Sequence, residues 1–168
     1  MKFSPLQLRL AGFGLAVITA YLDQWSKALI IAAAKTTSFP VTVLPVFNIA
    51  LVFNRGISFG MLSQTHAWGA LLLPLVLSAI VLALVVWLVQ AETIGVSLAL
   101  GLIIGGAAGN LIDRARAGMV TDFLDFHIGH YHWPAFNIAD SAIFIGVVIF
   151  IFTNIIGEKI AVKDNSTI

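Results

Sequence analysis

Long uncharged apolar segments recur along this chain, and short polar segments separate them. Residues 67–91 contain no Asp, Glu, Lys or Arg, and a second uncharged run covers residues 93–112. A helix needs about 20 mostly apolar residues to cross a membrane, so both runs are long enough. Two further apolar segments lie near the two ends of the chain. The predicted membrane-spanning helices are residues 8–34, 67–90, 93–112 and 134–156.

The first apolar segment also has features of a cleaved secretory signal peptide. Lys2 and Arg9 precede its apolar core, and the three alanines at 32–34 resemble a cleavage site. However, the segment is long for a signal peptide, and Asp23 and Lys27 interrupt it. We therefore expect a retained helix, and four spans then place both chain ends on one side of the membrane.

The polar connections are larger on one side of the predicted helices than on the other. Two large connections, residues 35–66 and 113–133, lie on the side opposite the chain ends. In residues 47–54 large apolar side chains alternate with smaller or polar ones, a period of two that predicts a strand. Turn residues follow at 54–56, and residues 57–62 are a candidate return strand. We expect a small sheet on the membrane surface.

Composition supports a single integral membrane domain over residues 1–168. Sixty per cent of the residues are hydrophobic and 10% are charged, whereas soluble domains carry about 25% charged residues. The net charge of +1 gives no electrostatic reason to expect a nucleic-acid partner. The chain has no cysteine, which excludes disulfides, thiolate nucleophiles and Cys-based metal sites. The predicted fold class is an all-α membrane protein, a four-helix bundle with a small β-sheet.

Asp23 and Lys27 interrupt the first apolar segment. A charged side chain at the bilayer centre costs at least about 2.5–3.5 kcal/mol, so such residues need an explanation. The two residues are four apart and lie on one helix face, where they can neutralise each other. With Lys27 extending towards the membrane interface, the pair predicts a structural role.

A stripe of glycines followed by polar residues ends the third predicted helix. Gly101, Gly105 and Gly109 form two overlapping GxxxG steps, which favour close approach of another helix. The polar residues that follow on one face are Asn110, Asp113 and Arg114. They are either an ordinary polar helix end or part of a functional site, and the pattern alone leaves both open.

The last predicted helix opens with a carboxylate that has no basic neighbour within one helical turn. This residue, Asp140, lies three positions after Asn137, and Asp122 precedes it on the same side of the membrane. Two carboxylates that meet in a low-dielectric site cannot both ionise cheaply, so one keeps a proton. Such a pair offers a base and an acid, which can activate water against an amide carbonyl. The alternative is two unrelated polar residues near a helix start.

Three histidines precede the last helix in an H-x-x-H-x-H pattern. Together with Asp125, His127, His130 and His132 offer ligands to a metal ion, but the spacing matches no strong zinc signature. We favour interfacial loop residues beside Trp133 over a metal site.

Taken together, these motifs resemble those of lipoprotein signal peptidases (signal peptidase II), bacterial inner-membrane aspartic peptidases that process prolipoproteins. The resemblance covers nearly the whole chain and rests on five blocks in the family's order. The blocks are Asp23-Gln24-x-x-Lys27, Asn54-x-Gly56-x-x-Phe59-Gly60, Gly105-Gly106-x-x-Gly109-Asn110-x-x-Asp113-Arg114, Val120-x-Asp122-Phe123 and Phe136-Asn137-x-Ala139-Asp140. Ile57 and Ser58 are larger and more polar than the small residues common there.

The resemblance implies a role for each block. Asp122 and Asp140 correspond to the family's catalytic dyad, and Asp23 and Lys27 to a mainly structural block. The residues implied to line or support the site are Asn54, Asn110, Asp113, Arg114 and Asn137. No metal and no cofactor is implied. The family topology places both termini in the cytoplasm, and both large connections and the active site at the periplasmic face of the inner membrane.

The substrate implied by the resemblance is a prolipoprotein with an S-diacylglyceryl cysteine. The enzyme cuts just before this cysteine by direct attack of water, and globomycin-type compounds are the implied inhibitors. The substrate's acyl chains and apolar signal helix can reach such a site through membrane lipid. The strand around Asn54 is a candidate clamp over the lipidated cysteine.

Three other functions fit parts of the pattern. A transporter or proton conduit would use Asp23, Lys27 and Asp140 as relay groups. A metal-dependent membrane enzyme would use Asp113, Asp122 and Asp140 as Mg²⁺ ligands. A structural assembly factor would use the glycine stripe as its contact surface.

Overall fold

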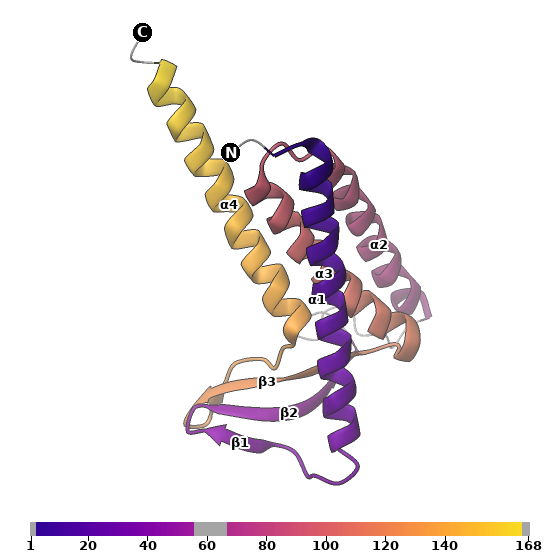
Figure 1. Cartoon of the computed structure of the whole chain (residues 1–168). Coiled ribbons are helices and arrows are strands. Elements are labelled where there is room, and N and C mark those ends of the chain that lie inside the picture. The colour runs from indigo at the N-terminus through magenta and orange to yellow at the C-terminus, as the bar shows by residue number, and fades with distance from the viewer. Residues whose placement is uncertain (1–2, 56–66, 166–168) are drawn as a thin grey trace.

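The computed structural model describes the backbone of residues 3–55 and 67–165, and the side chains of 3–55 and 74–153. Its helices are α1 (Pro5–Ala33), α2 (Ala67–Val89), α3 (Ile94–Ala117) and α4 (Ile138–Asn165). Its strands are β1 (Val41–Leu44), β2 (Phe47–Asn54), β3 (Val120–Ile128) and β4 (Tyr131–His132). The helices form a bundle with the sheet at one end (Figure 1). The candidate return strand at 57–62, with Ile57 and Ser58, lies outside the described residues.

Capping residues set the ends of α1 and α3. Ser4 and Gln7 form a capping box at the start of α1, where each side chain bonds the other's backbone N–H. The side chain of Thr93 caps α3 by accepting from the backbone N–H of Val96. Gly118 ends α3 with φ 68°, a left-handed conformation that favours glycine. Helix α3 therefore continues past residue 112, where the sequence predicted that the span ends.

Two of the helices, α1 and α3, are long and apolar enough to cross a membrane. Among the described residues, α2 and α4 contribute the shorter apolar stretches Pro74–Val89 and Ile138–Thr153. Much of the large apolar surface of these helices is exposed, including Leu6 and Val17 on α1 and Phe144 on α4. A surface of this kind suits a lipid environment better than water.

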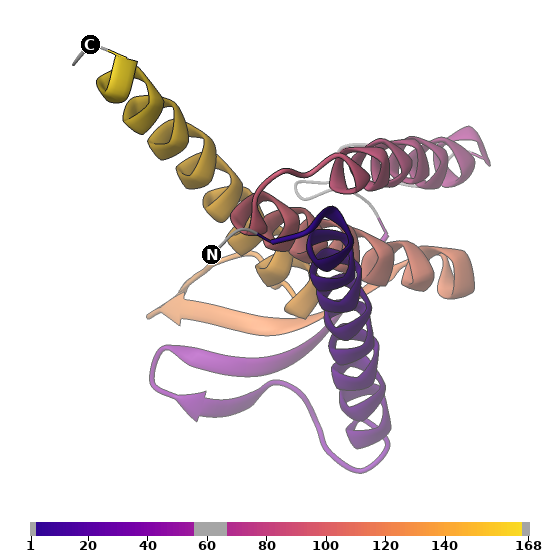
Figure 2. The ribbon, with the colours of Figure 1, turned by 45° about the horizontal axis from the view of Figure 1, so that its top comes forward.

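Helix α3 packs against all three other helices, most extensively against α1 and α4 (Figure 2). A Cβ atom built on Gly101 would lie 2.5 Å from the backbone oxygen of Gly12. One on Gly105 would lie equally close to the backbone oxygen of Ala16. Because no side chain fits at these two positions, the glycine stripe is a packing surface against α1, as the GxxxG spacing predicts.

The sheet is antiparallel in the order β1-β2-β3-β4. Residues 47–54 form a strand, as their alternation predicts. Residues 120–128 lie in the second large connection, where the sequence predicted no strand, and they form β3, which pairs with β2 over Val120–Phe126. In this register Val52 lies opposite Asp122 and Asn54 opposite Val120. The pairing brings the end of β2 to the first polar residues of β3.

The segment that enters α4 lies along the other side of β3. The backbone oxygen of Phe136 accepts from the N–H groups of Phe123 and Leu124, and its N–H donates to the oxygen of Leu124. The next residue, Asn137, is therefore held beside β3 just where α4 begins. The fold thus joins the start of α4 to the strand that carries Asp122.

Candidate active site

Asn137 lies between Asp122 and Asp140 and contacts both carboxylates. Its Nδ2 donates to Oδ1 of Asp122 at 2.7 Å, and its backbone N–H donates to Oδ2 of Asp140 at 3.3 Å. Its own Oδ1 accepts from the backbone N–H of Asp140 at 2.9 Å, which caps the start of α4. The side chain is fully buried. The two aspartates, 18 positions apart in the sequence, therefore lie around a single fixed amide.

Asn110 of α3 holds Asp140 from the opposite side. Its Nδ2 donates to Oδ1 of Asp140 at 2.8 Å, and its Oδ1 accepts from Nδ2 of Asn137 at 3.1 Å. Helices α3 and α4 thus share one hydrogen-bonded network. Asn110 therefore belongs to the hydrogen-bonded network around Asp122 and Asp140.

Asp122 is the buried member of the pair, with 2% of its surface exposed. Burial is the main cause that raises its pKa, to about 6, and the negative charge of Asp140 raises it further. The hydrogen bonds from Asn54 and Asn137 oppose this shift. The bond from Nδ2 of Asn54 to Oδ2 of Asp122 is 3.1 Å long. A carboxyl with this pKa can hold or release a proton near neutral pH.

Lys27 and Asp23 lie in the interior next to this network. Nζ of Lys27 is 2.7 Å from Oδ2 of Asp23, 2.8 Å from Oδ2 of Asp113 and 3.0 Å from Oδ1 of Asn110. The expectation that Lys27 extends to the membrane interface is wrong, because only 3% of its side chain is exposed. Two carboxylates and an amide oxygen from α1 and α3 compensate its desolvation.

Asp23 also fixes the start of α4. Its Oδ1 accepts from the backbone N–H of Ala139 at 3.0 Å. This N–H belongs to the first turn of α4, where the backbone donors have no partner within the helix. Because Ala139 precedes Asp140, the contact ties α1 to the helix that carries the second aspartate.

Asp113 binds partners from α1 and β3. Its carboxylate is bound by Lys27, by Nε2 of Gln24 at 2.7 Å and by the backbone N–H of Thr121 at 3.2 Å. Asp113 therefore supports the start of β3. Gln24 and Thr121 were given no role from the sequence. The only signal for Gln24 was its place inside the first motif block.

Arg114 lies close to the same acidic groups. Its Nη1 donates to the backbone oxygen of Asn110 at 3.2 Å, and the charges of Asp140, Asp122 and Asp113 all act on the guanidinium. The side chain is partly exposed. It supplies positive charge next to the two aspartates.

An apolar groove of about 390 Å³ opens beside Asp140. The groove gives access to Asp140, which is partly exposed, whereas Asp122 is buried. A substrate with apolar groups can reach Asp140 along this surface. The residues that line the groove are Trp133, Phe136, Asp140, Ser141, Phe144 and Ile145.

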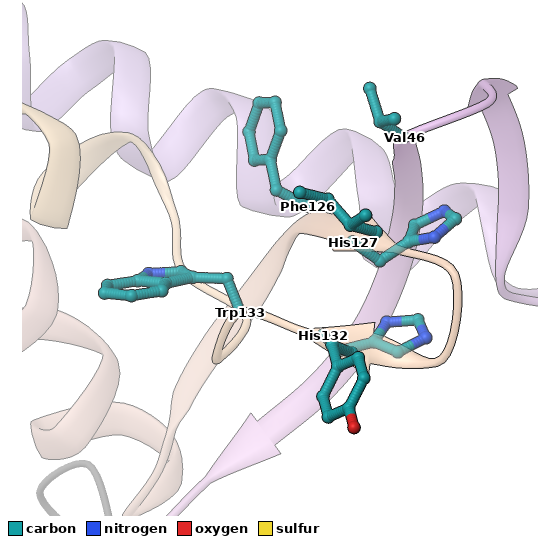
Figure 3. Close-up of a pocket in the computed structure, with 7 residues that line it drawn as sticks. Val46, Phe126, His127, His132 and Trp133 are labelled. Carbon is teal, nitrogen blue, oxygen red and sulfur yellow. The ribbon is translucent and has the colours of Figure 1, made fainter.

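The histidines lie on a hairpin at the far end of β3 (Figure 3). Burial alone would raise the pKa of Asp125, but hydrogen bonds from His132 and Asn48 hold it below its usual value. The bond from Nδ1 of His132 to Oδ1 of Asp125 is 2.8 Å long, and the ring of His132 stacks on that of His127. Within the described residues no three His, Cys, Asp or Glu side chains are grouped so that they could hold a metal ion. His127 and His132 belong to strands and not to the loop that the sequence predicted.

The structure brings most of the predicted site residues into one network. Asp122, Asp140 and their supporting residues come from the end of β2, the end of α3, the start of β3 and the start of α4. Hydrogen bonds and ion pairs join the following residues, of which Asp23 and Lys27 come from α1: Asp23, Lys27, Asn54, Asn110, Asp113, Arg114, Asp122, Asn137 and Asp140. Gly56, Phe59 and Gly60 lie outside the described residues.

Comparison with known proteins agrees with these motifs. A family model described as signal peptidase (SPase) II matches residues 15–156. A lipoprotein signal peptidase of Shewanella sp. (strain MR-4) is 42% identical over 149 residues, which cover 88% of this chain and 87% of the relative. One from Burkholderia mallei (strain SAVP1) is 41% identical over 142 residues, which cover 83% of this chain and 84% of the relative.

Two solved structures, both described as bacterial membrane enzymes, have the same fold. One superposes with a TM-score of 0.74 at 33% identity and covers 86% of this chain and 87% of its own. The other has a TM-score of 0.72 at 33% identity and covers 84% of this chain and 90% of its own. Family, relatives and fold agree over most of the chain, which belongs to the signal peptidase II family.

Proposed function

We propose that this protein is an aspartic endopeptidase that removes signal peptides from diacylglyceryl-modified prolipoproteins and cuts just before the lipidated cysteine. Family membership supports the general activity, removal of signal peptides from prolipoproteins. The observation that carries the aspartic mechanism is the geometry around Asn137, which binds Asp122 through its side chain and Asp140 through its backbone. Direct activation of water uses two carboxyl groups that are held near each other, and the contacts of Asn137 hold Asp122 and Asp140 in this way.

In the proposed mechanism Asp122 is the acid and Asp140 the base. The raised pKa of Asp122, caused by burial, favours a proton on this carboxyl. Asp140 lines the apolar groove, where water and the scissile bond can reach it. Asp140 takes a proton from water as the oxygen attacks the carbonyl carbon. Asp122 donates its proton to the carbonyl oxygen, which gives a tetrahedral diol. As the peptide bond breaks, Asp140 passes its proton to the leaving amine and Asp122 takes one back from a hydroxyl of the diol.

The groove beside Asp140 supports a lipidated substrate. Its walls are Trp133, Phe136, Phe144 and Ile145, and the last two are exposed on the outer face of α4. Substrate held in the membrane can enter there from the side, without crossing water. Asn54 donates to Asp122 from the end of β2, and this contact supports the strand around Asn54 as the clamp over the bound cysteine.

We infer a single domain with four membrane spans, corresponding to α1–α4, in the bacterial inner membrane. Both termini are in the cytoplasm, and the sheet and the dyad are at the periplasmic face. The sheet lies at one end of the helix bundle, and the start of α1 and the end of α4 lie towards the other, which supports placing both termini on the side opposite the sheet (Figure 1).

The test is cleavage of a diacylglyceryl-modified prolipoprotein by the purified protein in detergent. The variants are Asp122→Asn and Asp140→Asn, and the matched control is Asp125→Asn. Asp125 also lies on β3, but it pairs with His132 and Asn48. We expect cleavage by wild type and Asp125→Asn, in EDTA as well, and none by the two dyad variants.

Other outcomes separate the alternatives. If both dyad variants still cleave the substrate, the protein is a peptidase, but Asp122 and Asp140 are not its catalytic residues. Loss of cleavage in EDTA favours a metal-dependent enzyme. A folded wild type that cleaves no lipidated substrate calls for a flux assay in proteoliposomes, since a proton conduit would then be the better explanation. Equal cleavage of a non-lipidated control rejects the lipid requirement and the role of the groove.

A further inference from the structure

The hairpin formed by residues 126–133, here called the aromatic hairpin, exposes large apolar side chains. The exposed fractions are 46% for Phe126, 79% for Ile128, 87% for Tyr131 and 69% for Trp133. The hairpin contains no Asp, Glu, Lys or Arg. It borders a shallow apolar hollow of about 470 Å³, with Trp133 on one side and the two stacked histidines on the other (Figure 3). Of the exposed hairpin residues, Trp133 also lines the proposed substrate groove, and the others take no part in the proposed mechanism.

The surface of the aromatic hairpin continues into the outer face of α4. Trp133 lines both the hollow at the hairpin and the groove that contains Phe144 and Ile145. Phe144 and Ile145 are 71% and 50% exposed. If α4 spans the membrane, as proposed above, this face contacts lipid. Trp133 then connects this apolar face of α4 to the apolar surface of the hairpin.

The hairpin lies at the end of the sheet that is farther from α1 (Figure 1). In both views the ends of β2 and β3 away from α1 project sideways, on the side of α4 (Figures 1 and 2). A sheet placed at the membrane surface therefore extends the hairpin over lipid. Tyr and Trp are the side chains that concentrate at the boundary between lipid and water, because they combine an apolar ring with a polar group.

We propose that the aromatic hairpin docks into the headgroup region of the surrounding bilayer and anchors β3 to the membrane surface. The occupant is lipid and not a second copy of the chain, because the surface is continuous with the exposed apolar side of α4 and contains no Asp, Glu, Lys or Arg. Docking holds the strand that bears Asp122 at a fixed height above the bilayer. A lipidated substrate that arrives through the same leaflet then meets the dyad at that height.

The test uses the absence of native cysteine, which makes single labels specific. Nitroxide labels are placed at Ile128→Cys and Tyr131→Cys in nanodiscs of phosphatidylethanolamine and phosphatidylglycerol. Collision with oxygen, which concentrates in lipid, is compared with collision with a water-soluble nickel chelate. The water reference is Thr42→Cys, exposed on β1, and the lipid reference is Phe144→Cys on α4. Both hairpin positions are highly exposed, so labelling them leaves the packing unchanged.

We expect the oxygen-to-nickel ratio at 128 and 131 to exceed that at 42 several-fold and to approach that at 144. Equal ratios at 128, 131 and 42 would overturn the proposal. Low access of both reagents at 128 and 131, with dipolar coupling between labels on two chains, would assign the surface to a second copy and also overturn it. The readout does not depend on peptidase activity, so failure of the proposed function leaves this test intact.

Discussion

Asn110 donates a hydrogen bond of 2.8 Å from Nδ2 to Oδ1 of Asp140. Its Oδ1 accepts from Nζ of Lys27 at 3.0 Å and from Nδ2 of Asn137 at 3.1 Å. If the side-chain amide were rotated by about 180°, its nitrogen would face two donors, Nζ of Lys27 and Nδ2 of Asn137, and its oxygen would face the carboxylate of Asp140. The two donors therefore fix Asn110 as a hydrogen-bond donor to Asp140, and Lys27 acts on the dyad through it.

Removing the Asn110 amide should slow the chemical step. A hydrogen bond to a charged group contributes about 1.5–3 kcal/mol, so we expect Asn110→Ala to lower kcat by about 10–100-fold. KM should change little, because Asn110 is buried beneath Asp140. Single-turnover cleavage of a lipidated substrate measures the step directly.

The control for Asn110→Ala is Asn48→Ala. Asn48 is also a buried asparagine that donates to an aspartate, Asp125, but it lies on β2 away from the dyad. Its replacement should leave kcat unchanged. If both variants lose kcat equally, the effect of Asn110 is one of general stability and not of positioning.

Lys27→Met should destabilise the protein and also lower its activity. The change removes the cation that pairs with the buried Asp23 and the partly exposed Asp113, and loss of one partner of a buried ion pair typically costs about 3–5 kcal/mol. Arg116→Met is the matched control, because Arg116 is exposed and bonds only Gln24 among the described contacts. Its expected cost is within about 0.5 kcal/mol. Chemical unfolding of the detergent-solubilised variants gives both values, and similar stabilities for the two would contradict the role of Lys27.

The sequence was sufficient for the helices and for singling out Asp122 and Asp140, but not for the contacts that join them to the other elements. Uncharged length identified the helical segments, and the motif blocks identified Asp122 and Asp140. The predicted position of the Lys27 side chain, at the membrane interface, was wrong. The prediction considered only its pair with Asp23, which lies on the same helix. Its other partners, Asp113 and Asn110, lie on α3, and no periodicity within one helix reveals them.

Strand β3 was missed for a related reason. Asp122 and Asp125 are buried polar residues inside the strand, and they break the alternation that indicates a half-buried strand. Each is stabilised by partners from other elements, Asn54 and Asn137 for Asp122 and Asn48 for Asp125. Buried polar residues at a site obscure the pattern of the strand that carries them.

Gly109→Ala should destabilise the junction between α1 and α3. A Cβ at this position would lie 2.5 Å from Oδ2 of Asp23, which is fully buried. Forcing additional volume into a packed interior typically costs about 1–3 kcal/mol. Gly14→Ala is the control, since a Cβ there meets nothing within 4 Å, and alanine is the better helix former. Thermal unfolding should place Gly109→Ala below wild type and Gly14→Ala at or above it. The reverse order would show that α1 and α3 do not pack closely at Gly109.

Asp122 should titrate near pH 6, above its ordinary pKa of about 3.9. Burial is the main cause, and the charge of Asp140 adds to it, so Asp140→Asn should lower the pKa of Asp122. Asn54 stabilises the ionised form, so Asn54→Ala should raise this pKa. Carbon-13 NMR of labelled aspartates, assigned by comparison with Asp122→Asn, measures both shifts. Because an acid must be protonated to act, kcat/KM should fall as the pH rises through this value, and the fall should move to higher pH in Asn54→Ala. Titration of wild-type Asp122 near its ordinary value would remove the basis for assigning it as the acid.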